Sequence, residues 1–157
     1  MTQRVENMDF EIVPMGENHI DEVAVIETEC FENPWKKEDI ARQLTNENAH
    51  FLCAVSGGEV CGYIGIYEYF ESCETANLVV LPQFRRKGIA RALINAAAQG
   101  AKSRGREFIT LEVRPSNEAA LSLYSSLGFE KAGLRKNFYT SPVEDALILT
   151  KYFKEKK

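Results

Sequence analysis

One short stretch of the sequence, RRKGIAR at residues 85–91, has the residue types and spacing to hold a phosphate group. A strand is expected to end just before it, and a helix to begin at about Gly88. The first backbone N–H groups of a helix lack intrahelical acceptors and carry partial positive charge, so an anion binds well there. Gly88 and the small Ala90 would let that anion approach the backbone, and the three basic residues at 85–87 add charge around it. The pattern predicts a pyrophosphate site.

The glycine turn alone does not identify the ligand. No GK[ST] follows it, so it is not a Walker A nucleotide-binding loop, and the GxGxxG pattern of dinucleotide sites is absent. A glycine that eases the packing of a helix on a sheet, beside solvated arginines, explains the same residues.

A second set of candidate residues lies in LEVRPSNEAALSLYSSLGF, residues 111–129. Glu112 stands near the end of an expected strand, with its side chain on the opposite face from its two apolar neighbours. Asn117 has the position of a helix cap, and Tyr124 follows two turns later. A glutamate and a tyrosine can move protons, but a surface glutamate and a core tyrosine are the alternatives for these positions.

The elements that must position these residues alternate between strands and helices. In the first helix, Glu27 shares a three-to-four spacing with Val23 and Cys30. The glycine pair in Ser56-Gly57-Gly58 predicts a hairpin within residues 50–70. Further strands are expected at 9–15, 74–82, 107–113, 129–139 and 145–153, and helices from Asn18 through about Phe31, from 33–35 through Leu44, over 88–104, and from Asn117 to Gly128.

This order predicts an α+β fold. Its sheet is mainly antiparallel, and helices are inserted between the strands. One strand–helix–strand unit, built around the helix at 88–104, should make its two strands parallel.

Composition limits the classes of protein that fit. The chain has 157 residues, 45% hydrophobic and 27% charged, and a net charge of −4. These values predict one globular domain over 1–157, with residues 1–8 as an N-terminal extension. The acidic balance argues against a nucleic-acid-binding surface, and no apolar run is long enough for a membrane or export segment. A cytoplasmic protein is therefore expected, without a nucleic-acid or membrane partner.

Metal chemistry is not indicated. The four cysteines form no CxxC pair, and the chain has only two histidines, at positions 19 and 50. We expect reduced cysteines packed as small apolar residues, and no metal site.

Taken together, the glycine turn, the preceding NLVVLP, the segment at 111–129 and the terminal RKNFY…EDALIL resemble the GNAT family of acetyl-CoA-dependent N-acetyltransferases. CFENPW at 30–35 is similar to the substrate-side helix pair of its RimI-type subgroup. The resemblance covers nearly the whole chain. It implies a three-layer α/β sandwich whose mixed, mostly antiparallel sheet has about seven strands, with four helices.

The resemblance also implies residue roles. Acetyl-CoA would be the donor, with the pantetheine arm and acetyl group on the backbone of one strand and the pyrophosphate on the glycine turn. Glu112 would be the general base and Tyr124 the general acid. The implied cofactor-binding residues are Leu78, Val79, Val80, Arg85, Arg86, Lys87, Gly88, Ile89, Ala90, Arg91 and Asn117.

The implied acceptor is a protein or peptide N-terminus, in the RimI-type subgroup the N-terminal alanine of a small-subunit ribosomal protein. At pH 7 an α-amine with a pKa of ~8 is roughly a tenth neutral, whereas a lysine with a pKa of ~10.4 is neutral about once in 2,500. Direct attack of that amine in a ternary complex needs no covalent nucleophile. Phe31, Trp35 and Tyr139 are the expected acceptor-binding residues, although Trp35 could instead cap a hydrophobic cluster.

Two other functions remain open on the sequence alone. One keeps the fold and the donor but changes the acceptor to a small-molecule amine or a protein lysine. The other is a non-catalytic acyl-CoA-binding module, against which the pair Glu112 and Tyr124 argues, because binding alone needs neither proton donor nor acceptor.

Overall fold

The computed structural model describes residues 9–154, and the extension expected over residues 1–8 lies outside them. The chain divides into two compact units, Met1–Tyr67 with Ala76–Ala97, and Glu68–Thr75 with Ala98–Lys157. We call them the first and the second unit. The expectation of a single domain over the whole chain stays a prediction.

Within the described residues there are seven strands and four α-helices, as predicted. The strands are β1 Glu11–Pro14, β2 Ala49–Ser56, β3 Glu59–Tyr69, β4 Ser72–Val80, β5 Phe108–Val113, β6 Glu130–Tyr139 and β7 Glu144–Tyr152. The α-helices are α1 Ile20–Cys30, α2 Lys37–Arg42, α3 Ile89–Ser103 and α4 Glu118–Ser126, and short 3₁₀ turns occupy η2 Glu17–His19, η3 Gln43–Thr45 and η4 Pro82–Phe84.

The strands form one sheet in the order β1-β2-β3-β4-β5-β7-β6. The pairs β1–β2, β2–β3, β5–β7 and β6–β7 are antiparallel, and β4–β5 is parallel. The parallel pair is joined through α3, because two parallel strands need a long crossover connection. The strand–helix–strand unit that the sequence predicts is therefore confirmed.

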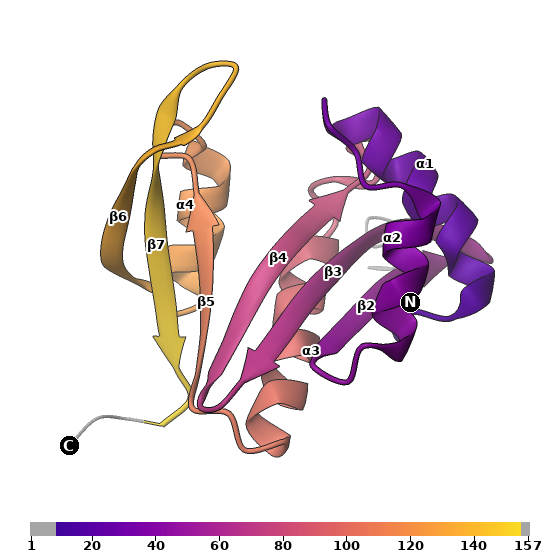
Figure 1. The fold of residues 1–157 in the computed structure, drawn as a ribbon, viewed down its shortest axis with the longest axis horizontal. Helices are drawn as coiled ribbons and strands as arrows, with labels where there is room; N and C mark the ends of the chain where they lie inside the picture. Colours follow the sequence, from indigo (N-terminus) through magenta and orange to yellow (C-terminus); the bar gives the residue numbers. More distant parts are fainter. Residues whose placement is uncertain (1–8, 155–157) are drawn as a thin grey trace, which may run out of the picture. The chain divides into compact units, whose positions relative to one another are not determined.

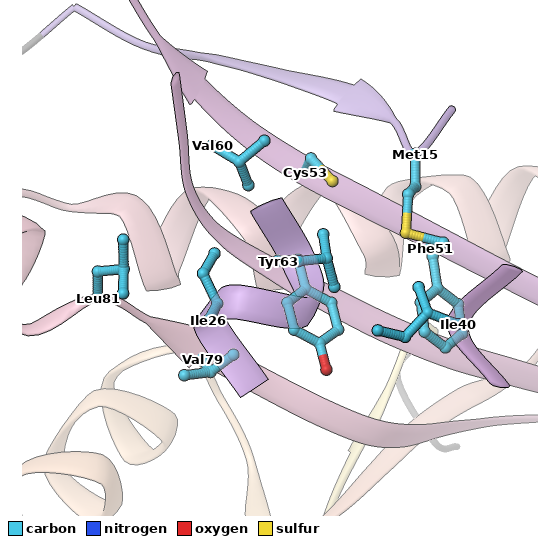
Figure 2. Close-up of a cluster of buried hydrophobic side chains, with 10 residues drawn as sticks. Met15, Ile26, Ile40, Phe51, Cys53, Val60, Tyr63, Val79 and Leu81 are labelled. Atoms are coloured by element: carbon cyan, nitrogen blue, oxygen red, sulfur yellow. The ribbon is translucent and has the colours of Figure 1, made fainter. Parts of the chain in front are cut away.

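The core of the first unit lies between its strands and the helices α1 and α2 (Figure 1). Side chains from both helices interlock with side chains from β2, β3 and β4 (Figure 2). Burial of this apolar surface is the main favourable term in forming the unit. The buried cluster consists of Met15, Val23, Ile26, Ile40, Phe51, Cys53, Val60, Tyr63, Val79 and Leu81.

The second unit places α4 beside the strands β5, β7 and β6 (Figure 1). Along β5, buried and half-buried residues alternate strictly, with Ile109, Leu111 and Val113 buried. Glu112 therefore points to the other face, as the sequence predicts. At the start of α4, the Asn117 side chain accepts a hydrogen bond from the Ala120 amide at 3.1 Å, which confirms it as the helix cap.

Two helix starts in the first unit differ from the prediction. Asn18 is not a cap but lies inside η2, because the turn begins at Gly16, whose N–H donates to Nδ1 of His19 at 2.9 Å. The second helix begins at Lys37 rather than at 33–35. Pro34 disfavours a helical conformation for the residue before it, and the Trp35 N–H donates to the Glu27 carboxylate instead of joining a helix.

The hairpin between β2 and β3 is confirmed. Gly57 and Gly58 both have positive φ, +59° and +81°, as the favoured two-residue turns require. Farther along β3, Gly62 lies against the end of β4: a Cβ there would meet the Val79 carbonyl oxygen at 2.6 Å and the Val80 Cα at 3.1 Å. The missing side chain lets β3 approach the backbone of β4.

Gly62→Ala should therefore destabilise the protein, because the added methyl group would push against backbone atoms that cannot rotate away. We expect a loss of about 1–3 kcal/mol in the free energy of unfolding, measured by urea denaturation. Gly133→Ala is the control, since its Cβ would meet only the Ile148 Cδ1 at 3.4 Å. Equal stability of the Gly62 and Gly133 variants would contradict this account of the β3–β4 approach.

Candidate functional site

The basic turn of the first unit has the predicted form. Gly88 has a φ of +85°, α3 begins directly after it at Ile89, and a Cβ on Gly88 would meet nothing within 4 Å. Arg86 also has a positive φ, +64°, an uncommon conformation for a residue with a side chain. Arg86, Lys87 and Gly88 are exposed. An anion could therefore reach the helix start without displacing protein atoms.

Arg85 differs from its neighbours because its side chain is engaged within the protein. Its Nε donates to the Val80 carbonyl oxygen at 2.8 Å, which ties the basic turn to the end of β4. It also lies beside the thiol of Cys30, whose pKa is raised by burial and held back by the Arg85 guanidinium. We conclude that Arg85 orients the turn as well as adding charge to it.

The predicted acyl-binding residues Leu78, Val79 and Val80 lie on β4 beyond Ser72–Glu74, the part that pairs with Phe108–Thr110 of β5. Val79 and Val80 are buried, and Leu78 is half-buried. The segment ends at the carbonyl group that Arg85 binds.

The two acceptor residues predicted in the first unit have different surroundings. Phe31 follows α1 and is 39% exposed. Trp35 is half-buried, and its ring packs against Phe51 with centroids 6.2 Å apart. The alternative considered for Trp35, that it covers a hydrophobic cluster, thus describes its ring correctly.

Glu112, predicted to be the base, forms an ion pair with Arg135 of β6. The Glu112 side chain is 27% exposed and that of Arg135 is 58% exposed, so the pair is open to water. Sequence reasoning missed Arg135. The sequence does place a basic residue on the last strand but one, but it does not give the pairing register that brings this residue to Glu112.

Tyr124, predicted to be the acid, is buried on α4, and its ring lies 5.7 Å from that of Phe129. Burial raises the pKa of Tyr124 to about 12, and the nearby Tyr139 adds to the shift. The pKa of Tyr139 is also raised, first by burial and then by the Glu112 carboxylate. Tyr139 therefore lies within electrostatic reach of both Glu112 and Tyr124, and we refer to these three predicted site residues as the cluster.

A bulge in β6 sets the position of Tyr139. Between the pairs Arg135↔Ala146 and Tyr139↔Glu144, β6 has three residues where β7 has one. The extra residues include Asn137, which has a φ of +50° and donates its N–H to the Asp145 carboxylate at 2.8 Å. Bulges redirect side chains and are frequent beside functional sites. The sequence predicted an unbroken strand here.

Arg114 supports the cluster from the segment after β5. Its guanidinium carbon lies 4.4 Å from the centroid of the Tyr139 ring, and its Nη1 is 3.2 Å from Oε1 of Glu144. Glu144 also accepts the N–H of Ser116 at 2.8 Å and its hydroxyl at 2.9 Å. Partial burial by itself would raise the pKa of Glu144. The bonds from Ser116 and Arg114 outweigh that effect, so the net pKa is lowered.

Arg114 and Glu144 were also missed by sequence reasoning. The signal for them was a pair of opposite charges at the adjoining ends of two antiparallel strands. Asn117 directly follows Ser116, and its N–H donates to the Arg114 carbonyl oxygen at 3.0 Å, so the residues around this ion pair also fix the start of α4.

Among residues 9–154, no group of three or more histidine, cysteine, aspartate or glutamate side chains could hold a metal ion. No helix in this part of the chain combines the length and apolar character needed to cross a membrane.

Comparison with known proteins identifies the family. Residues 20–129 match the Acetyltransferase (GNAT) family. This chain belongs to the GNAT acetyltransferase family. Over 136 residues it is 33% identical to the N-alpha-acetyltransferase RimI of Mycobacterium tuberculosis, covering 80% of this chain and 82% of that protein.

Solved structures agree with the GNAT assignment. The crystal structure of the ribosomal-protein-S18-alanine N-acetyltransferase from Escherichia coli has a TM-score of 0.84 and 27% identity, covering 95% of this chain and 97% of that chain. Arabidopsis thaliana NAA60 in complex with acetyl-CoA has a TM-score of 0.81 over 92% of this chain and 99% of that one, and its 17% identity shows the fold.

The predicted GNAT fold and the class of enzyme, an N-acetyltransferase of the RimI type in a family that uses acetyl-CoA, are therefore confirmed. The roles assigned to individual residues stay predictions.

The buried phenol of Tyr124 gives a direct test of the cluster. Subtracting the tyrosinate absorbance of Tyr124→Phe from that of the unaltered protein during an alkaline titration should leave one group with a pKa of about 12. An exposed tyrosine would titrate near ~10. Circular dichroism recorded alongside confirms that the fold persists. A difference curve with its midpoint near 10 would show that Tyr124 is not buried in this way.

Proposed function

We propose that this GNAT enzyme transfers the acetyl group of acetyl-CoA to the N-terminal α-amine of a protein, and that the natural acceptor is a small-subunit ribosomal protein beginning with alanine. The cluster of Glu112, Tyr139 and Tyr124 carries the proposal, because Tyr139 interacts electrostatically both with a carboxylate and with a buried phenol that stays protonated at neutral pH. The acceptor is supported by the likeness to the N-alpha-acetyltransferase of M. tuberculosis and to the ribosomal-protein-S18-alanine N-acetyltransferase of E. coli. A cytoplasmic location is part of the proposal.

The donor would be bound mainly by residues of the first unit. The exposed start of α3 suits a pyrophosphate because the backbone N–H groups of the first helical turn and the basic residues Arg86, Lys87 and Arg91 occur at the same end of the helix. The backbone of Leu78–Val80, beyond the part of β4 that pairs with β5, would bind the pantetheine arm and the acetyl group. Asn117, whose oxygen caps α4, would contribute its amide nitrogen.

Glu112 would remove the proton that the attacking amine must lose. The amine nitrogen forms a bond to the thioester carbon while its proton passes to Glu112, directly or through a water molecule. A backbone N–H of the Val79–Val80 region would stabilise the negative oxygen that develops, a contribution typically of about 3 kcal/mol. Arg135 keeps the carboxylate oriented on the exposed side of β5 before the amine arrives.

Tyr124 would assist the leaving thiolate as the carbon–sulfur bond breaks. With a pKa of about 12, Tyr124 is a weaker acid than a thiol of pKa ~8.5, so complete proton transfer to the thiolate is unfavourable at equilibrium. The raised pKa instead favours a hydrogen bond from the phenol to the developing negative charge. The thiolate would then take its proton from water after release.

The proposal is tested by incubating the protein with acetyl-CoA and a peptide that begins with alanine, and measuring thiol release. A matched peptide with an acetylated α-amine should support none above the background. Glu112→Gln should lower kcat/KM by about 10²–10⁴-fold, the usual effect of losing a general base. Tyr124→Phe should lower kcat more than it raises KM, because the phenol acts on the leaving group.

Control variants separate these effects from damage to the fold. Glu130→Gln, an exposed carboxyl of β6, and Tyr152→Phe, at the end of β7, should retain kcat/KM within about twofold. Thiol release with a polyamine, or with an N-terminally acetylated peptide that contains an internal lysine, would favour a different acceptor. Thermal stabilisation by acetyl-CoA without any turnover would favour a binding module.

A further inference from the structure

A buried carboxylate in the first unit has no role in the proposed reaction. Glu27, on α1, is 1% exposed and lies among the apolar residues of the core. An isolated charge buried in this way would cost several kcal/mol, so the carboxylate must be satisfied by donors.

Three donors reach Glu27 from three separate segments. The Tyr63 hydroxyl of β3 donates to Oε2 of Glu27, and the Asn77 Nδ2 of β4 donates to the same oxygen at 3.2 Å. The backbone N–H of Trp35 donates to Oε1 at 2.9 Å. Asn77 also donates to the Tyr63 oxygen at 2.9 Å. All of these partners present hydrogens to the carboxylate, which suits a group that only accepts when it is ionised.

Tyr63 holds its proton firmly. Its ring lies within the apolar cluster, and its hydroxyl points away from Val60 and Cys53 (Figure 2). Burial, followed by the Glu27 carboxylate, raises the pKa of Tyr63 far above its usual value. The phenol therefore remains protonated at neutral pH and donates to Glu27.

Glu27 joins two segments that the proposed reaction assigns to different substrates, one to the acceptor and the other to acetyl-CoA. Trp35 stands in the segment between α1 and α2, predicted to contact the acceptor, and Asn77 directly precedes the predicted acetyl-binding residue Leu78. Because Trp35 donates through its backbone, the bond fixes the path of the chain and leaves the ring to pack on Phe51.

We propose that Glu27 is a positioning residue that holds the acceptor-binding segment at Trp35 in place against β4, so that its loss weakens acceptor binding and spares donor binding. This inference rests on the proposed function for the identity of the acceptor. Glu27 touches neither substrate and acts through the Trp35 backbone.

Glu27→Met is the informative variant, because methionine has a similar volume and no strong acceptor. Tyr63 and Asn77 would keep their mutual hydrogen bond, and the N–H of half-buried Trp35 could turn to water, so the fold should survive. We expect the KM for an alanine-initiated peptide to rise at least about tenfold, as for loss of one charge-assisted hydrogen bond, and kcat and the KM for acetyl-CoA to stay within about twofold.

Two further variants isolate the bond to Trp35. Glu27→Gln can still accept the Trp35 N–H through its amide oxygen, so it should hold the peptide KM within about threefold. Tyr63→Phe removes a different donor from the same carboxylate and should also leave the peptide KM nearly unchanged. If Glu27→Met does not fold, Glu27→Asp, whose shorter carboxylate does not reach Trp35, takes its place with the same expectation.

Hydrogen exchange of the Trp35 amide, measured by NMR, supplies a readout that needs no substrate. Exchange should be at least about tenfold faster in the Met variant and near the unaltered rate in the Gln and Phe variants. An unchanged peptide KM in Glu27→Met, or equal effects of Met and Gln, would overturn the inference. An unaltered protein that does not acetylate the peptide would overturn the proposed function, and amide exchange would still decide whether Glu27 holds this segment.

Discussion

The ion pair between Arg114 and Glu144 holds together the parts of the second unit on which the candidate chemistry depends. It joins the segment after β5 to the start of β7, and its members also contact Ser116 and the Tyr139 ring. Glu112 lies two residues before Arg114, and Asn117, the cap of α4, lies three residues after it. The Nη1–Oε1 distance of the Arg114–Glu144 pair is 3.2 Å, and the same carboxylate accepts several hydrogen bonds. The pair is therefore part of a network, whereas an isolated surface ion pair would contribute little to stability.

Glu112 and Tyr124, the two candidate catalytic residues, differ in how their surroundings prepare them. Glu112 stands on the half-exposed face of β5, paired with an arginine that water also reaches, so an incoming cationic amine meets a carboxylate already in place. Tyr124 lies on the buried side of α4, where loss of solvation keeps the phenol protonated. One fold thus keeps a proton acceptor and a hydrogen-bond donor available at the same pH.

Much of this arrangement follows from local sequence rules. The side on which Glu112 points follows from the two-residue period of a strand, and the cap at Asn117 follows from the preference of helix starts for asparagine. The β6 bulge does not follow, because it depends on Asp145 of the neighbouring strand binding the Asn137 amide. Glu27 was predictable in part. Its helix spacing with Val23 indicated a buried face, but its three partners come from segments up to fifty residues away, which local rules do not reach.

The central claim is that acetyl transfer is directed to an α-amine, and its most direct test uses one peptide with two acceptors. A peptide with a free N-terminal alanine and an internal lysine would be incubated with acetyl-CoA and the protein at pH 7, and fragmentation mass spectrometry would locate the added acetyl group. The account predicts acetylation of the N-terminal alanine with the lysine unmodified, in line with the far larger neutral fraction of an α-amine. An acetyl group found on the lysine, with the alanine free, would contradict it.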